Sequence, residues 1–274
     1  MAAVLGIDAA WTEKNDSGFA LAEKIGGRWR LSAAASNIRR FAAACGLDGE
    51  AETKAGPAFA IVCAERILGD RLPDLIAVDM PLSRKDITGR RASDIEVSRR
   101  FGAAKCATHS PSEDRPGKVS AKLRRACEAR GYTLATAQPL GAALSLAEVY
   151  PHPALLRLMA VPERFPYKVN KTNTYWRGAP SDARLANVKK SLGAIVANLE
   201  LRIAGVAERV GEEISVAEGF SALKPVEDMI DAIIAAWVGI TILEGGAEPI
   251  GDADSAIWIP NVLKPAAGQA GAAR

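Results

Sequence analysis

Short apolar segments that run directly into a carboxylate are the feature that most restricts how this chain can fold. Residues 4–7 are followed by Asp8, residues 75–78 by Asp79, and the stretch LSLA by Glu148. Apolar runs of this length are typical of buried strands. A single Asp after a strand is ordinarily a turn residue or a helix cap. Several such acids predict side chains that converge on one point at the edge of a sheet.

The size and composition of the chain are those of a globular protein. It has 274 residues, of which 49% are hydrophobic and 24% charged, enough for one large core. We expect one domain over residues 1–262, with a basic insertion at 84–140, and a flexible C-terminal tail at 263–274. The net charge of +3 is too small to establish a polyanionic partner by itself.

Several classes of protein are excluded by simple residue counts. The four cysteines are far apart and only two histidines occur, which argues against a zinc site or a disulfide framework. The longest apolar run, at 233–243, is about half of the roughly 20 residues that a membrane span needs. The N-terminus lacks the basic start of a signal peptide. We therefore expect a cytoplasmic protein that does not enter a membrane.

The order of predicted elements indicates an α/β fold. Three short strands with turn signals between them form an antiparallel meander, followed by a helix and a buried strand. Further along, we expect a short helix, a strand that ends with Glu148, a long amphipathic helix, an apolar helix and a last strand end. The predicted ranges are strands at 4–8, 18–23, 28–35 and 75–78, helices at 56–68, 120–130, 182–209 and 227–246, and a strand end at 258–260.

Acidic residues also lie in the last predicted helix. Asp228 and Asp231 are three positions apart and share one face. Asp228 suits an ordinary role as a first-turn acid that complements the helix dipole. Asp231 begins an otherwise apolar stretch, where a buried carboxylate is costly unless a cation pairs with it.

Together these acids predict a site for a hard divalent cation. Oxygen ligands without a Cys or His cluster suit Mg²⁺ or Mn²⁺. Enzymes that cut phosphodiesters use two such ions about 4 Å apart. The predicted metal ligands are Asp8, Asp79, Asp228 and Asp231, and the predicted catalytic residues are Asp8, Asp79, Glu148 and Asp231.

Both the order of elements and the positions of the acids resemble the ribonuclease H fold, a mixed sheet flanked by helices. The stretches GIDAAW and EDMIDAIIAAW are similar to the first hairpin and last helix of Holliday-junction resolvases. The chain more closely resembles the family called domain of unknown function 429, described as predicted RNase H-like nucleases. The matching stretches are GIDAAW, AVDMPL, RRASDIEVSRR, EVYPHPAL, FPYK and KPVEDMIDAIIAA.

A basic segment is the predicted contact surface for nucleic acid. Residues 84–130 hold thirteen Lys or Arg against six acids, although a charge run is more often a solvated face. His152 could contact a metal-bound phosphate, but a histidine in such a position more often bonds a nearby carbonyl. The aromatic residues around Lys168, among them Tyr167, could stack a base, but such residues more often pin a loop to the core. The predicted substrate contacts are Arg90, Arg91, Arg99, Arg100, His152 and Lys168.

Three functions are compatible with this pattern. A metal-dependent nuclease or phosphodiesterase is the leading interpretation. A non-catalytic module of the same fold that binds nucleic acid or protein is the second. An actin-like phosphotransferase is the third, but it needs a Gly- and Thr-rich phosphate loop after the first strand, where this chain has Ala9, Ala10 and Trp11.

Overall fold

The computed structural model of the chain describes residues 2–12, 14–47, 56–137 and 144–261. The predicted tail at 263–274 lies outside these residues. One mixed sheet has the strand order β3-β2-β1-β4-β6-β8-β7, and a further strand, β5, pairs with β6. The strands are β1 (Ala3–Asp8), β2 (Gly18–Ile25), β3 (Arg28–Ala35), β4 (Leu75–Val78), β5 (Thr133–Ala135), β6 (Ser145–Val149), β7 (Ala247–Gly251) and β8 (Ala256–Pro260).

The predicted meander is confirmed, because β1, β2 and β3 pair in antiparallel fashion. In contrast, β4 is parallel to β1, β6 is parallel to β4, and β8 is parallel to β6. Parallel strands present their carboxyl ends at the same edge of the sheet. Ile7 lies opposite Val78, and Val78 lies opposite Glu148. Asp8, Asp79 and Glu148 therefore lie at or just after the carboxyl ends of three neighbouring strands, at the same edge of the sheet.

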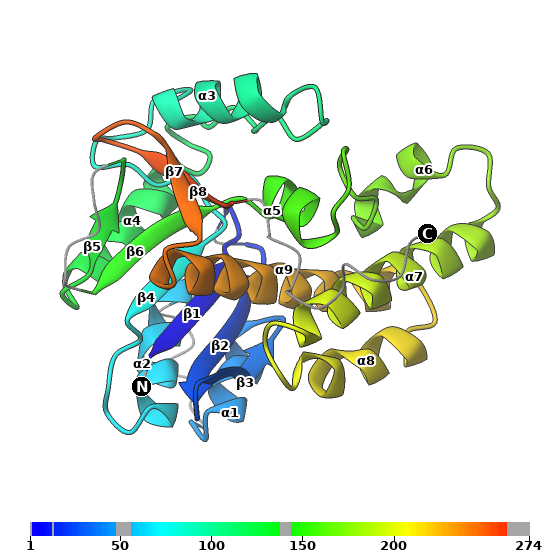
Figure 1. Cartoon of the computed structure of the whole chain (residues 1–274), viewed down its shortest axis with the longest axis horizontal. Coiled ribbons are helices and arrows are strands. Elements are labelled where there is room, and N and C mark those ends of the chain that lie inside the picture. The colour runs from blue at the N-terminus through cyan, green and yellow to red at the C-terminus, as the bar shows by residue number, and fades with distance from the viewer. Residues whose placement is uncertain (1, 13, 48–55, 138–143, 262–274) are drawn as a thin grey trace, which may run out of the picture.

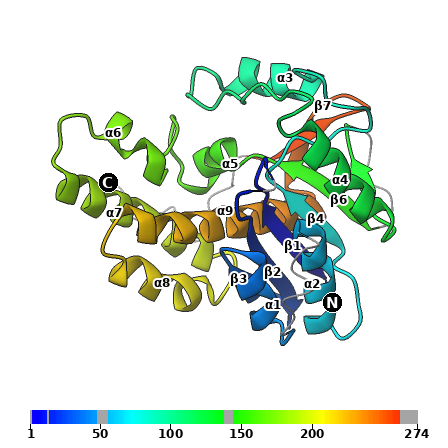
Figure 2. The ribbon, with the colours of Figure 1, turned by 180° about the vertical axis from the view of Figure 1, so that it is seen from behind.

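Alternating side chains of the sheet pack against two layers of helices (Figures 1 and 2). Leu5 and Ile7 point to a core shared with α1 (Ile38–Ala44), α2 (Phe59–Ile67) and α4 (Gly117–Glu128). Val4 and Ala77 point to the opposite core. The helices of that core are α5 (Pro151–Leu158), α7 (Ser181–Glu200), α8 (Val206–Val216) and α9 (Phe220–Leu243).

Helix α9 crosses the middle of the sheet and contacts β1, β2 and β4 (Figure 1). Two glycines allow its backbone to lie unusually close. A Cβ atom on Gly6 would be 2.2 Å from the carbonyl oxygen of Ala232, and one on Gly18 would be 2.2 Å from the carbonyl oxygen of Asp228. Absence of these side chains brings the start of α9 against the end of β1.

Two further helices, α3 (Ala92–Phe101) and α6 (Thr172–Tyr175), complete the described elements. Helix α3 packs against β7 and β8. After α5, a 3₁₀ turn at Val169–Lys171 leads into the short helix α6. Among the described residues, none of the helices is long and apolar enough to cross a membrane.

Some of the sequence-based boundaries are wrong. The single amphipathic helix predicted at 182–209 is two helices, α7 and α8, separated at residues 201–205. Helix α7 ends at Glu200, and Gly205, with a φ of 92°, directly precedes α8 in a left-handed conformation. Glycine adopts this conformation without the steric cost of a side chain. Helix α9 begins at Phe220, earlier than the predicted residue 227. The short strands β5 and β7 were not predicted.

Candidate metal centre

Three carboxylates converge where the end of β1 meets the first half of α9. One oxygen each of Asp8, Asp228 and Asp231 lies within 4.8 Å of the others. Asp231 is fully buried, while Asp8 and Asp228 are half-buried. Asp79, half-buried after β4, lines the same cleft as Asp8. The structure thus brings together the four predicted metal ligands, three of them in one cluster and Asp79 beside it. We refer to Asp8, Asp79, Asp228 and Asp231 as the carboxylate cluster.

Asp231 is held by two neighbours from the segment before α6. The hydroxyl group of Tyr167 donates a hydrogen bond of 2.6 Å to Oδ1, and the ammonium group of Lys168 donates to Oδ2. Lys168 Nζ also lies 3.3 Å from Oε1 of Glu227. Each carboxylate oxygen keeps a further lone pair, so these contacts orient Asp231 without using up its capacity to bind a cation.

A second lysine, Lys224, lies against the acidic side chains in the first half of α9. Lys224 Nζ lies 3.0 Å from Oε1 of Glu227 and also donates to Oδ1 of Asp228, one helical turn later. The other oxygen of Glu227 accepts a hydrogen bond of 2.5 Å from the backbone of Val169. Glu227 is therefore engaged in holding the Tyr167–Lys168 segment against α9.

The electrostatics of the cluster disfavour several bare negative charges. Burial raises the pKa of Asp8 well above its ordinary value, and the charge of Asp231 raises it further. Burial also raises the pKa of Asp79 to about 7, although the charge of Lys168 partly offsets the effect. The pKa of Asp231 is raised by burial as well, against the opposing effect of Lys168. A cation placed among these groups would be stabilised by the same charges that repel one another.

A cleft of about 1110 Å³ opens beside the cluster. Its lining combines the acids Asp8, Asp16, Asp79, Glu227 and Asp228 with a set of cationic side chains. These cations are Lys14, Arg115, Arg164, Lys168, Lys171 and Lys224, together with the two histidines, His109 and His152. The cleft is large enough to admit a substrate several times the size of a metal ion.

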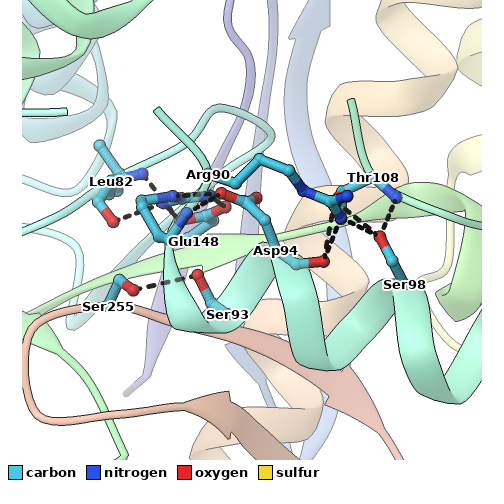
Figure 3. Close-up of polar contacts among 9 residues, drawn as sticks. Leu82, Arg90, Ser93, Asp94, Ser98, Thr108, Glu148 and Ser255 are labelled. Carbon is cyan, nitrogen blue, oxygen red and sulfur yellow. Dashed lines mark hydrogen bonds and ion pairs between the residues drawn. The ribbon is translucent and has the colours of Figure 1, made fainter. Parts of the chain in front are cut away.

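The structure does not bring Glu148 into the carboxylate cluster. Its Oε2 lies 2.5 Å from Nη1 of Arg91 and accepts a hydrogen bond of 2.7 Å from the backbone of Leu82. Nη2 of Arg91 also lies 2.7 Å from Oδ1 of Asp94. Figure 3 shows Glu148, Asp94 and Leu82 in this network. Glu148 therefore binds Arg91, which also binds Asp94 in α3, and so helps to hold α3 against the sheet. Its position after an apolar stretch did not reveal this structural role.

The four arginines predicted to contact substrate have intramolecular partners instead. Arg91 is buried between Asp94 and Glu148. Arg90 donates to the carbonyl group of Asp94 and the hydroxyl group of Ser98 (Figure 3). Arg99 and Arg100 both pair with Glu96. Within the described part of the chain, none of the four lines the cleft.

His152 and Lys168, the other two predicted contacts, do line the cleft. Burial lowers the pKa of His152 well below its ordinary value, and the charges of Lys168 and Arg164 lower it further. The ring is therefore neutral near pH 7. Its Nε2 faces Nη2 of Arg164 at 2.5 Å, and because a guanidinium group only donates, Nε2 is the acceptor.

Sequence reasoning missed several residues of the site. Lys224 stands four positions before Asp228, a spacing typical of helical ion pairs, so it was accessible to the same argument that singled out Asp231. Tyr167 was interpreted as a residue for stacking or packing, whereas its hydroxyl group contacts Asp231. Lys171 lies in the same mixed aromatic and basic stretch as Tyr167 and Lys168, but it was not among the predicted substrate contacts. Arg164 carries no pattern in the sequence that distinguishes it from a surface cation.

Comparison with known proteins gives a family but no activity. The model of the family described as protein of unknown function (DUF429) matches residues 6–256, so the chain belongs to that family. No curated protein matches the chain.

Proposed function

We propose that this member of the DUF429 family is a divalent-metal-dependent phosphodiesterase of ribonuclease H type that acts on nucleic acid. The observation that carries the proposal is the convergence of Asp8, Asp228 and Asp231, whose oxygens lie within 4.8 Å of one another at the end of the central strand. The parallel strands that follow the meander, and a buried helix that crosses them, agree with a ribonuclease H-like arrangement.

The donor set fits a hard cation. All three ligands are carboxylates, which suit Mg²⁺ or Mn²⁺. Asp8, Asp228 and Asp231 would hold the ion, with Asp79 at its side. When bound, the ion would polarise a phosphoryl oxygen and lower the pKa of a water molecule.

The chain itself would orient the ligands. Tyr167 and Lys168 fix the rotamer of Asp231 by bonding both of its oxygens. Asp79 lines the cleft beside Asp8 and would offer a further carboxylate next to the ion. His152 is neutral and holds the guanidinium group of Arg164 within the cleft.

The test combines metal binding with cleavage. We expect Mn²⁺ to raise the melting temperature of the protein, and the protein to cut at least one member of a panel of single-stranded, duplex and branched DNA and RNA when Mn²⁺ or Mg²⁺ is added. Asp8→Asn should lose both properties. The matched control is Asp114→Asn, because Asp114 is exposed and pairs with the exposed Lys118, outside the cleft.

A second candidate function is a binding module that has lost turnover. It is favoured by the two lysines, Lys168 and Lys224, which already neutralise the acids of α9. In that case Mn²⁺ has no effect on melting, and Asp8→Asn binds nucleic acid as well as the wild type does. Metal-dependent melting or cleavage would rule it out.

A further inference from the structure

In the part of the chain that the structure describes, several basic residues pair with acids, whereas three cations of the cleft do not. Arg99 and Arg100 pair with Glu96, Arg124 with Glu128, and Arg130 with Glu65. Arg115, Arg164 and Lys171 line the cleft, and within the described residues none of them forms an ion pair with a carboxylate. Their charged groups are therefore not engaged by a carboxylate in direct contact.

Arg164 is positioned by a neutral group. Its backbone N–H donates to the carbonyl group of Ala104 at 2.9 Å, and its Nη2 donates to Nε2 of His152. Since the imidazole ring is uncharged, it fixes the direction of the guanidinium group without cancelling its charge. An arginine held in this way keeps its remaining donors for another acceptor.

The three cations also lie close enough to act on one imidazole ring. Burial lowers the pKa of His109, and the charges of Arg164, Lys171 and Arg115, in that order, lower it further. Like charges gathered without a counter-charge repel one another. An anion bound among them would remove that repulsion.

We propose that Arg115, Arg164 and Lys171 form a subsite for a phosphate group of the substrate, in the same cleft as the carboxylate cluster. Guanidinium groups match phosphate oxygens in a bidentate manner, and a lysine adds a compact point charge. The inference rests on the proposed function and deepens it. A strand whose reacting phosphate lies at the carboxylates would place another of its phosphates, internal or terminal, on these three cations.

The test measures binding without metal, so that it does not depend on catalysis. A fluorescent single-stranded oligonucleotide is titrated into the full-length protein in EDTA at several salt concentrations. Removing one phosphate contact lowers the slope of log K against log salt by about 0.7 for a single strand. We expect Arg164→Ala and Lys171→Ala each to lower the slope by about this amount and to weaken binding by about tenfold at low salt.

The controls use cations of equal charge outside the cleft. Lys118→Ala, which removes an exposed lysine paired with Asp114, should leave affinity and slope unchanged. The double variant Arg99→Ala/Arg100→Ala tests the earlier sequence-based surface. If that double variant lowers the slope while Arg164→Ala and Lys171→Ala do not, the subsite is overturned. Lys171 is exposed, so its variant keeps the test valid even if Arg164→Ala fails to fold.

Two further arms identify the phosphate and separate this inference from the proposed function. Oligonucleotides with and without a 5′-phosphate are compared: a preference that disappears in Arg164→Ala assigns a terminal phosphate, and equal loss for both assigns an internal one. Melting with Mn²⁺ is measured for every variant. If Mn²⁺ has no effect on any protein but Arg164→Ala still weakens oligonucleotide binding, the metal-dependent activity fails and the subsite stands.

Discussion

At the scale of single residues, the carboxylate cluster combines repulsion with partial neutralisation. Asp8 lies among Asp79, Asp228 and Asp231, and all of these charges raise its pKa. Two lysines, Lys168 and Lys224, lie against the acids from α9. A site of this kind costs stability in the absence of a metal, and groups held for function commonly carry such a cost.

Asp8→Asn should therefore leave the melting temperature of the metal-free protein unchanged or raise it, because the substitution removes one of several like charges and keeps the shape of the side chain. In the wild type, Mn²⁺ at 100 times its dissociation constant should stabilise the fold by about 2.7 kcal/mol. Asp8→Asn should lose most of this gain. Thermal melting with and without Mn²⁺ measures both effects, and a variant that responds to Mn²⁺ like the wild type would remove Asp8 from the site.

Arg91 is predicted to matter for stability rather than for binding. Replacing it with Leu leaves Asp94 and Glu148 buried without their cation, which should cost about 3–5 kcal/mol of unfolding free energy. Urea unfolding measures the loss. Arg99→Leu is the matched control, because Arg99 is exposed and water screens its pair with Glu96, so that the pair should contribute little to stability. Similar losses for the two variants would contradict the structural role of Arg91.

At the scale of elements, the closeness of α9 to the sheet sets the geometry of the metal centre. Asp228 and Asp231 come from α9, while Asp8 comes from β1. Helix α9 approaches β1 closely at Gly6 and β2 closely at Gly18. Because these glycines have no Cβ atom, the backbone of the helix can lie close to the strands. The position of the carboxylates is thus a consequence of backbone packing as much as of the acids themselves.

Gly18→Ala should displace the start of α9, since the new Cβ would be 2.2 Å from the carbonyl oxygen of Asp228. Overpacking of this kind typically costs about 1–3 kcal/mol, and the affinity for Mn²⁺ should fall with it. Denaturant unfolding and a Mn²⁺ titration measure the two effects. Gly193→Ala is the control, because nothing lies within 4 Å of that position in α7, and a helical Ala should stabilise by about 0.5–1 kcal/mol.

At the scale of the whole molecule, the buried acids make the stability of the metal-free protein depend on pH. Asp79 has a pKa raised to about 7 by burial, above the ordinary range of a carboxyl group in an unfolded chain. Between the pKa of Asp79 in the unfolded chain and its pKa of about 7 in the folded protein, the folded state binds more protons than the unfolded state. Stability is therefore lost as the pH rises through about 7.

We expect the free energy of unfolding to increase as the pH falls from about 8 to about 6.5. Below about 6.5 the opposite effect of His152 begins, because its lowered pKa means that the unfolded chain takes up a proton first. Asp79→Asn should flatten the slope between these two pH values. Urea unfolding across this range measures the slope. A wild-type slope of the opposite sign would show that the pKa values of the buried acids are not raised. Mn²⁺ should oppose the trend, because deprotonated carboxylates bind it better.

The sequence by itself determined the elements and the set of acids. Period-two runs, turn residues and an all-apolar helix are local patterns, so the meander, β4 and the buried character of α9 could be predicted from neighbouring residues. Asp8, Asp79, Asp228 and Asp231 stood out because each interrupts or ends an apolar surface, which is costly without a partner. The break between α7 and α8, at residues 201–205, was missed because the apolar spacing continues across it.

Only the tertiary structure decided which charge faces which. Glu148 and Asp8 both end buried strands, yet Glu148 meets Arg91 and Asp8 meets the acids of α9. The same holds for the cations: Arg99 and Arg100 stood in the conspicuous basic segment but pair with Glu96, whereas Arg164 and Lys171 reach the cleft. Coulomb interactions and hydrogen bonds depend on distances between residues far apart in the chain, and those distances are set by how α3, α5 and α9 pack on the sheet.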